Sequence, residues 1–223
     1  MLALAYILLI CLGLPLVAWF SKKKIDEGLV VPRLALYGEA LFLQILLLFI
    51  SYGVASATGV RPFLPPELDA RAVLWGLGVL ALALIAMAVA WRFARPQSRA
   101  RLAMLLPVTA PERAVFIAVS AAAGVSEEVA FRGVLPVLLA RQTGSFALAV
   151  AISATAFALA HLLQGWWATL FVGIFGVIFH ALVWVTGGLW TAIAVHILYD
   201  WIAGLVLARM FGLQPQEVAD AKV

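Results

Sequence analysis

The chain has 223 residues, of which 65% are hydrophobic and 12% are charged, and its mean hydropathy is +1.10. Soluble domains contain about 45–50% apolar and about 25% charged residues, so this composition excludes a soluble globular protein and indicates an integral membrane protein. The net charge is +4, but no basic patch is interleaved with aromatic residues, so we expect no nucleic-acid partner. The single cysteine, Cys11, excludes an internal disulfide framework and a cysteine metal cluster.

Apolar segments that can cross a membrane recur along the chain. A helix needs about 20 apolar residues to cross a hydrocarbon layer about 30 Å thick. The segments predict an all-α fold, a polytopic membrane bundle of about seven helices within a range of about six to eight. The predicted spans are residues 2–20, 34–55, 73–91, 114–140, 145–163, 166–185 and 189–208.

The loops between these spans differ in positive charge. Lys22, Lys23, Lys24 and Arg33 follow the first span, and five arginines between residues 92 and 113 follow the third. The loops after the second and fourth spans carry fewer basic residues. Short cytoplasmic loops carry the excess of Lys and Arg, so we expect the N-terminus outside and the C-terminus in the cytoplasm. The compact size and the lack of targeting extensions favour the plasma membrane of a prokaryote.

The character of the chain changes near residue 110. We divide it into residues 1–110, with three spans and basic cytoplasmic loops, a core over 111–210 with four spans, and a short polar tail over 211–223. The core spans contain nearly all ionisable groups expected at membrane depth: Glu127, Glu128, Arg132, His161, His180, His196 and Asp200. Each charge at the centre of a span costs about 2.5–3.5 kcal/mol on insertion scales, so the cluster indicates a functional cavity among the C-terminal helices.

The segment GVSEEVAFRG, residues 124–133, holds three of these groups. Glu128 and Arg132 are four residues apart and share one helix face, so they can form an ion pair. Glu127 lies about 100° further around the helix and can point into a cavity. A structural cluster that locks this span to its neighbours is the alternative, and it explains Arg132 better than a direct chemical role does.

Three histidines lie in the later spans. His161 follows Phe157 by one turn, and His196 precedes Asp200 by one turn. Such i, i+4 pairs suit a shared metal, proton or oxyanion, although H-x-x-x-D alone is a weak signal. His180 is interpreted as a supporting or structural residue.

Together these residues suit the activation of water. A partly desolvated carboxylate can act as a general base. Imidazoles can hold a metal that acidifies water or can donate hydrogen bonds to a developing oxyanion. Both peptide-bond hydrolysis and proton relay remain open at this point.

Three motifs carry a family resemblance. E-E-x-x-x-R (Glu127 to Arg132), F-x-x-x-H (Phe157 to His161) and H-x-x-x-N/D (His196 to Asp200) occur in this order on hydrophobic helices. The pattern resembles the CPBP family, also called Abi, which comprises type II CAAX prenyl proteases and bacteriocin-processing or immunity proteins. The likeness covers about residues 110–208 and includes the TGGLW stretch over 186–190. It implies an intramembrane endopeptidase with its cavity among the core helices.

The resemblance also implies roles for the site residues. Glu127 would activate water with help from His161, His196 and Asp200 would stabilise the oxyanion, and Glu128 and Arg132 would support the site. Members are often described as metalloproteases, but a metal-free glutamate mechanism has also been proposed. Zinc or another divalent cation therefore remains open, with Glu128, His161, His196 and Asp200 as candidate ligands.

Asp200 departs from the family pattern, which often has Asn at this position. An ionised aspartate cannot donate a hydrogen bond to an oxyanion. It is therefore protonated, orients His196 or helps to bind a cation, and the last option tilts the interpretation towards a metal-assisted variant.

The expected partners are the lipid bilayer and a peptide or lipid-modified protein substrate, prenylated or not; the sequence gives no oligomeric state. A non-catalytic immunity or scaffold protein and a small proton-coupled transporter are the alternatives. The complete motif set argues against the first, and the lack of a detectable internal repeat argues against the second.

Overall fold

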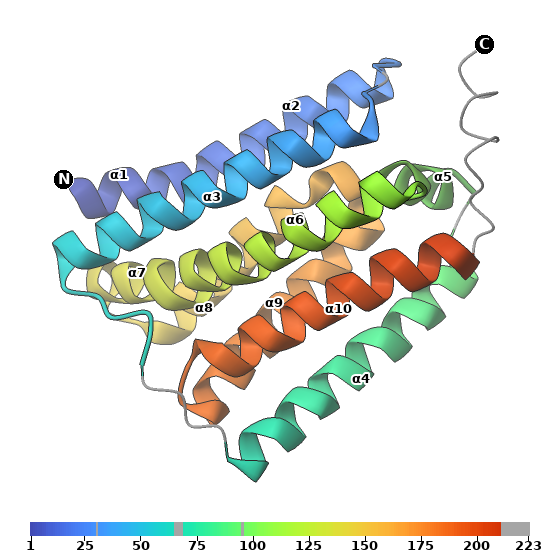
Figure 1. Ribbon diagram of the computed structural model, residues 1–223. Coiled ribbons are helices and arrows are strands. Elements are labelled where there is room, and N and C mark those ends of the chain that lie inside the picture. Colours follow the sequence, from blue (N-terminus) through green and yellow to red (C-terminus); the bar gives the residue numbers. More distant parts are fainter. Residues whose placement is uncertain (30, 65–68, 95, 211–223) are drawn as a thin grey trace.

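The computed structural model describes residues 1–29, 31–64, 69–94 and 96–210, and this part of the chain is helical without a strand (Figure 1). The all-α membrane bundle is therefore confirmed. The polar tail predicted over residues 211–223 lies outside the described residues.

The first part of the chain forms three long helices and one short helix. The elements are α1 (Leu2–Leu8), a π-helical stretch η1 (Leu9–Gly13), α2 (Leu14–Asp26), α3 (Arg33–Thr58), α4 (Ala70–Phe93) and α5 (Pro96–Leu105). The first three elements are continuous and form one span. The short helix α5 lies where the sequence predicted only a polar loop, so that expectation was incomplete.

The second part of the chain begins with a long interrupted helix and continues with three further helices. The elements are α6 (Ala110–Glu128), a π-helical stretch η2 (Val129–Val134), α7 (Leu135–Thr143), α8 (Phe146–Ala160), a 3₁₀ turn η3 (Leu162–Gln164), α9 (Trp166–Thr186) and α10 (Leu189–Met210). Each predicted span corresponds to one of these helices or continuous runs.

Six helices in the described part of the chain are long and apolar enough to cross a membrane. The seventh apolar helix, α8, has 15 residues, or about 22 Å at the usual rise of about 1.5 Å per residue. This is shorter than the predicted span over 145–163, because α8 ends at Ala160 and the chain turns at His161. The bundle agrees with the expected range of six to eight helices.

Local sequence signals explain where the central helix begins. The Thr109 hydroxyl accepts from the Glu112 backbone N–H at 3.4 Å, and the Glu112 carboxylate accepts from the Thr109 N–H at 2.9 Å. This reciprocal capping satisfies two backbone donors that the first helical turn leaves free. Pro111, in the first turn, has no N–H to lose. At the other end of the span, Gly144 adopts the left-handed conformation (φ 70°) that ends α7.

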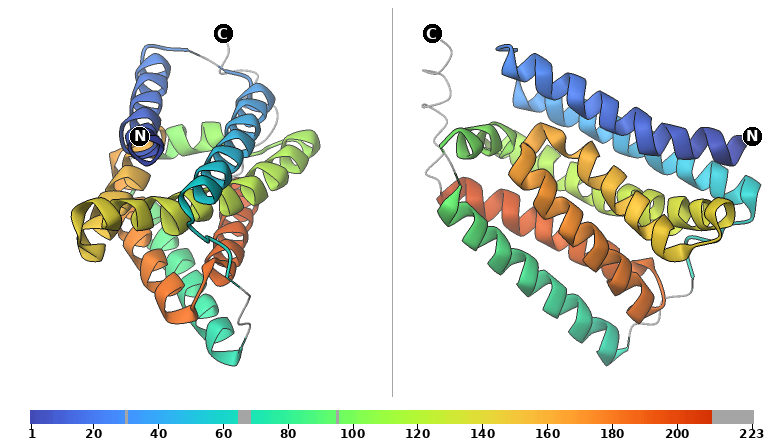
Figure 2. Two further views of the ribbon diagram at one scale, coloured as in Figure 1. Left: turned by 90° about the vertical axis from the view of Figure 1, so that its left-hand side faces the viewer. Right: turned by 180° about the vertical axis from the view of Figure 1, so that it is seen from behind.

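The helices are stacked in layers, and helices that are neighbours in a layer or between layers are not always consecutive in the sequence (Figures 1 and 2). The continuous α1–α2 helix and α3 lie on one side, and α6, η2 and α7 form the middle of the molecule. The helix α10 packs between α6 and α4, and α9 packs against α8 and α4. The helix α4, third among the spans, therefore lies on the far side of the molecule from α3. The central layer is covered on both sides, and Glu127, Glu128 and Arg132 lie in it.

Candidate active site

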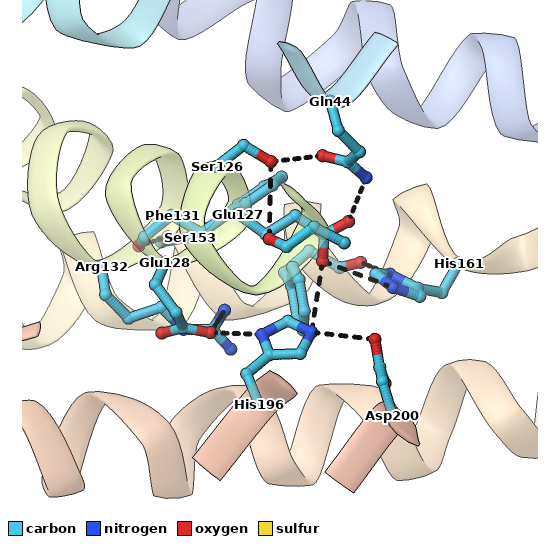
Figure 3. A network of polar contacts seen from close by, with 12 residues as sticks. Gln44, Ser126, Glu127, Glu128, Phe131, Arg132, Ser153, His161, His196 and Asp200 are labelled. Carbon is cyan, nitrogen blue, oxygen red and sulfur yellow. Dashed lines mark hydrogen bonds and ion pairs between the residues drawn. The ribbon is translucent and has the colours of Figure 1, made fainter. Parts of the chain in front are cut away.

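The six site residues predicted from the sequence lie in one cluster (Figure 3). Glu127 and Glu128 come from the end of α6, and Arg132 comes from η2. His161 follows α8, and His196 and Asp200 lie one turn apart on α10. The structure thus brings together residues from three separate spans.

Glu128 is the most deeply buried residue of the cluster. Its side chain is fully buried, and its Oε1 accepts from Arg132 Nη1 at 3.0 Å and bonds His196 Nδ1 at 2.7 Å. The ion pair predicted from the i, i+4 spacing is present. A buried carboxylate is tolerable when it is both paired and hydrogen-bonded. Glu128 therefore links α6 to α10 and holds the imidazole of His196 by its Nδ1.

Arg132 packs between aromatic rings. The centre of its guanidinium lies 4.0 Å from the ring centroid of Phe157 and 5.4 Å from that of Phe179. A cation over an aromatic face gains electrostatic attraction, which is larger away from water. The phenylalanine of the F-x-x-x-H motif therefore supports the arginine of the first motif.

The π-helical stretch η2 lies between the glutamates and α7. A π-helical turn carries an extra residue relative to an α-helix and leaves a backbone carbonyl in need of another donor, and such turns occur often at functional sites. Here the Ser153 hydroxyl of α8 donates to the Phe131 carbonyl at 2.6 Å, and both residues are buried. This bond ties the irregular turn, which also carries Arg132, to the neighbouring helix.

Glu127 points away from Arg132 and into the cluster. Its Oε1 accepts from Gln44 Nε2 at 2.7 Å. Its Oε2 lies 3.8 Å from Nε2 of both His161 and His196. This oxygen is buried and accepts no hydrogen bond from the described residues. One oxygen of the carboxylate is thus held from α3, and the other faces two imidazoles.

A hydrogen bond of the His161 ring to the backbone defines its tautomer. Its Nδ1 lies 2.8 Å from the Phe157 backbone carbonyl, and a carbonyl oxygen can only accept. The proton of the neutral ring therefore resides on Nδ1, and Nε2, which faces Glu127, has a free lone pair.

His196 lies between two carboxylates on opposite edges of its ring. Glu128 bonds Nδ1, and Asp200 Oδ2 lies 3.8 Å from Nε2. The Asp200 side chain is the most exposed of the cluster, at 30%, against 12% for His196. Glu127, His161 and Asp200 therefore surround the side of His196 that bears Nε2.

A close approach of α6 and α10 makes the bond between Glu128 and His196 possible. A Cβ at Gly124 would lie only 2.5 Å from Ile197 Cγ1 and 3.3 Å from the Ile197 backbone nitrogen. Gly124 is one turn before Glu128 on the same helix face, and Ile197 follows His196. A residue without a side chain at this crossing lets the two helices, and hence the two site residues, meet.

The four candidate metal ligands do not all face one point, because Glu128 contacts the opposite edge of the His196 ring from Asp200. In the part of the chain that the structure describes, no group of three or more His, Cys, Asp or Glu side chains is arranged to hold a metal ion. At His196, Glu128 occupies Nδ1 while Asp200 lies beside Nε2. A single ion cannot contact both edges of one imidazole, so Glu128 and Asp200 cannot join His196 in one ligand set.

Four residues around the cluster were not predicted from the sequence. Gln44 and Ser126 form a hydrogen-bonded chain with Glu127, Ser153 holds the Phe131 carbonyl, and Phe179 packs on Arg132. Gln44 had a usable signal, since it is the only amide within the apolar residues 34–55. The others resemble ordinary helix residues. His180, predicted as supporting or structural, is buried, and its Nε2 makes no hydrogen bond with the described residues.

Comparison with known proteins gives a match to a family model. Residues 109–202 match the family model described as type II CAAX prenyl endopeptidase Rce1-like. No curated protein and no solved structure matches the chain. The matched segment contains the glutamate, histidine and aspartate positions of the cluster but not α3, from which Gln44 comes. Over residues 109–202, therefore, the chain is similar to the Rce1-like type II CAAX prenyl endopeptidases, which confirms the resemblance indicated by its motifs.

Proposed function

We propose that the protein is an intramembrane endopeptidase that hydrolyses a peptide bond of a membrane-associated substrate with water activated by Glu127. The observation that carries the proposal is the position of Glu127 Oε2, buried and 3.8 Å from Nε2 of both His161 and His196. These separations are too long for direct hydrogen bonds and suit a water molecule held between the three groups.

In the first step, a water molecule donates one hydrogen bond to Glu127 Oε2 and the other to the lone pair of His161 Nε2. Glu127 takes the proton, and the water oxygen bonds to the carbonyl carbon of the substrate. The electron pair of the C=O bond moves to the carbonyl oxygen, which becomes an oxyanion. General-base assistance of this kind contributes about 10²- to 10⁴-fold in rate.

His196 is placed to act on the oxyanion. Its Nδ1 is held by Glu128, and as an imidazolium it would carry a second proton on Nε2 for donation to the oxyanion. Asp200 beside Nε2 orients the ring in this proposal. In the second step the C–N bond breaks, and the proton held by Glu127 passes to the departing nitrogen. The products are a carboxylic acid and an amine.

The direct test is Glu127→Gln, which keeps the shape of the side chain and removes the base. We expect kcat on a prenylated CAAX-type peptide, or on the best member of a peptide library, to fall by about 10²- to 10⁴-fold. Glu39→Gln, the same change at an exposed position of α3, is the matched control. Unchanged turnover in Glu127→Gln would remove the proposed base.

Metal dependence needs a separate measurement, because the proposal assigns no step to a metal. Metal content of the purified protein and activity with and without a chelator should be measured together. Activity that survives complete removal of bound metal supports the glutamate mechanism. Activity that is lost with the chelator and restored by zinc would require a rearranged ligand set.

The same proposal includes an orientation in the membrane. The basic residues at the ends of α2 and α4 and at the start of α6 support a cytoplasmic location for those ends. In this proposal the N-terminus lies outside, and the membrane is a prokaryotic plasma membrane. The thiol of a Lys23→Cys variant should react with an impermeant thiol reagent only when the reagent has access to the cytoplasmic side of the membrane. Reaction from the outside would reverse the orientation.

A further inference from the structure

The side chain of Gln44 connects α3 to the proposed base. Its Nε2 donates to Glu127 Oε1 at 2.7 Å, and its Oε1 accepts from the Ser126 hydroxyl at 2.5 Å. An amide nitrogen only donates and an amide oxygen only accepts. An ionised Glu127 therefore requires the nitrogen of Gln44 to face it, and Ser126, fully buried, occupies the other end of the amide. The amide is held in one orientation by both contacts (Figure 3).

This contact determines how the Glu127 carboxylate is turned. With Oε1 bound to Gln44, rotation of the carboxyl group is restricted, and Oε2 is the oxygen presented to the two imidazole nitrogens. The partner is neutral, unlike the guanidinium of Arg132 that pairs with Glu128. A neutral donor orients a carboxylate without compensating its charge, so Glu127 remains free to take a proton.

The place of Gln44 on α3 follows from the helix face that packs inward. Tyr37, Leu47 and Ser51 are buried on the same side of α3, whereas Leu43 and Ile45, which flank Gln44, are exposed. A polar amide within an apolar span is expensive unless it is hydrogen-bonded inside the protein. The contact to Glu127 and Ser126 supplies both bonds.

We propose that Gln44 is a positioning residue for the proposed base, so that α3 completes an active site otherwise built within residues 109–202. The inference rests on the endopeptidase function proposed above. It assigns to Gln44 no contact with the substrate; the residue acts through the orientation of Glu127.

The experiment compares Gln44→Leu, which removes both hydrogen bonds, with Gln142→Leu, the same change at an exposed position of α7. In Gln44→Leu we expect kcat to fall by about 10- to 100-fold, the range typical of residues that orient a reactive group, with KM nearly unchanged. Gln142→Leu should match the unchanged protein in both constants. A loss of packing alone would instead change the melting temperature and the folded yield and leave the kcat of the folded fraction unaltered.

A second variant keeps the test decisive if Gln44→Leu folds poorly. Gln44→Glu preserves the side-chain shape but faces Glu127 with a second carboxyl group, and the two can sit together only by sharing a proton. His161 and His196 face the same carboxylate from α8 and α10, so kcat of Gln44→Glu is compared with that of the unchanged protein at each pH. We expect the ratio to rise as the pH is lowered from about 8 to about 6, because a shared proton restores a donor to Glu127.

The outcomes separate the two proposals. If Glu127→Gln abolishes cleavage while both Gln44 variants keep the kcat of the unchanged protein, the positioning role is wrong and the endopeptidase proposal stands. If Glu127→Gln cleaves normally, the endopeptidase proposal fails first. A loss of kcat in Gln44→Leu together with the pH-dependent ratio in Gln44→Glu supports the positioning role.

Discussion

The two parts of the chain use membrane helices in different ways. In each of the first three spans, 22% of the most apolar window is buried within the protein, whereas in the span Ala110–Thr143 the share is 50%. The outer helices therefore present most of their side chains to lipid, and the central helix is surrounded by protein. Ionisable side chains are tolerated at membrane depth where protein replaces lipid around them, which explains why Glu127, Glu128 and Arg132 lie on the central helix.

The ion pairs of the two parts show the same difference. Lys23 and Glu27, at the end of α2, are 58% and 62% exposed and lie 3.8 Å apart. Glu128 and Arg132 have the same i, i+4 spacing, but are 0% and 2% exposed and lie 3.0 Å apart. Identical spacing along a helix thus gives a solvated pair in one part and a buried pair in the other, and the two should respond very differently to substitution.

Breaking the buried pair should have the largest effect on stability. Arg132→Met leaves the buried carboxylate of Glu128 without its cation, so we expect a loss of about 3–5 kcal/mol in the free energy of unfolding, measured with denaturant in detergent micelles. The double variant Glu128→Gln with Arg132→Met removes both charges and should be more stable than Arg132→Met alone. A double variant less stable than the single one would show that an uncompensated charge is not the cause.

Widening the crossing of α6 and α10 should have the next largest effect. Gly124→Ala places a methyl group against Ile197, so we expect a loss of about 1–3 kcal/mol in stability and a fall in kcat, because Glu128 moves away from His196. Gly53→Ala on α3 is the control, since a Cβ there meets nothing within 4 Å. Equal stability and activity of the two variants would show that the close approach is unimportant.

Freeing the carbonyl of the π-helical turn should have a smaller effect. Ser153→Ala removes the hydroxyl that donates to the Phe131 carbonyl, so we expect thermal unfolding to show a loss of about 1–2 kcal/mol. Thr155→Ala removes an exposed hydroxyl that bonds within its own helix and should change stability by less than about 0.5 kcal/mol. A larger loss in Thr155→Ala than in Ser153→Ala would contradict this account of the turn.

Breaking the exposed ion pair of Lys23 and Glu27 should have the smallest effect on stability. Lys23→Ala removes one partner of Glu27, and we expect a change of at most about 0.5 kcal/mol in stability, diminishing as salt is added. The measurement is denaturant unfolding at low and high ionic strength. A salt-independent loss comparable to that of Arg132→Met would erase the distinction between the two parts of the molecule.

Much of the fold follows from the sequence because span length and hydropathy are properties of local segments. The six long spans were recognisable in this way, whereas α8 proved shorter than its apolar segment suggested. Its end depends on the turn at His161, where Nδ1 bonds the Phe157 carbonyl. The helix α5 was missed because its segment is polar and lacks apolar residues that recur at the spacing of a helix.

Some contacts of the candidate site could likewise be predicted from the sequence, and others could not. The pair Glu128–Arg132 was predictable, since an α-helical spacing of four places two side chains on one face and the π-helical turn that follows leaves them in contact. Gln44 was not, because a single amide in an apolar span does not indicate which helix it faces. Its partner, Glu127, is 83 positions away in the chain.

The amino-acid sequence alone determined that the protein is an integral membrane protein, which apolar segments are helical and which side chains share a helix face, because these depend on hydropathy and on the period of the helix. Only the tertiary structure decided that Gln44 meets Glu127 and that His196 lies between Glu128 and Asp200. Contacts between helices depend on how closely they cross, and α6 and α10 can approach near the site because Gly124 has no side chain to clash with Ile197.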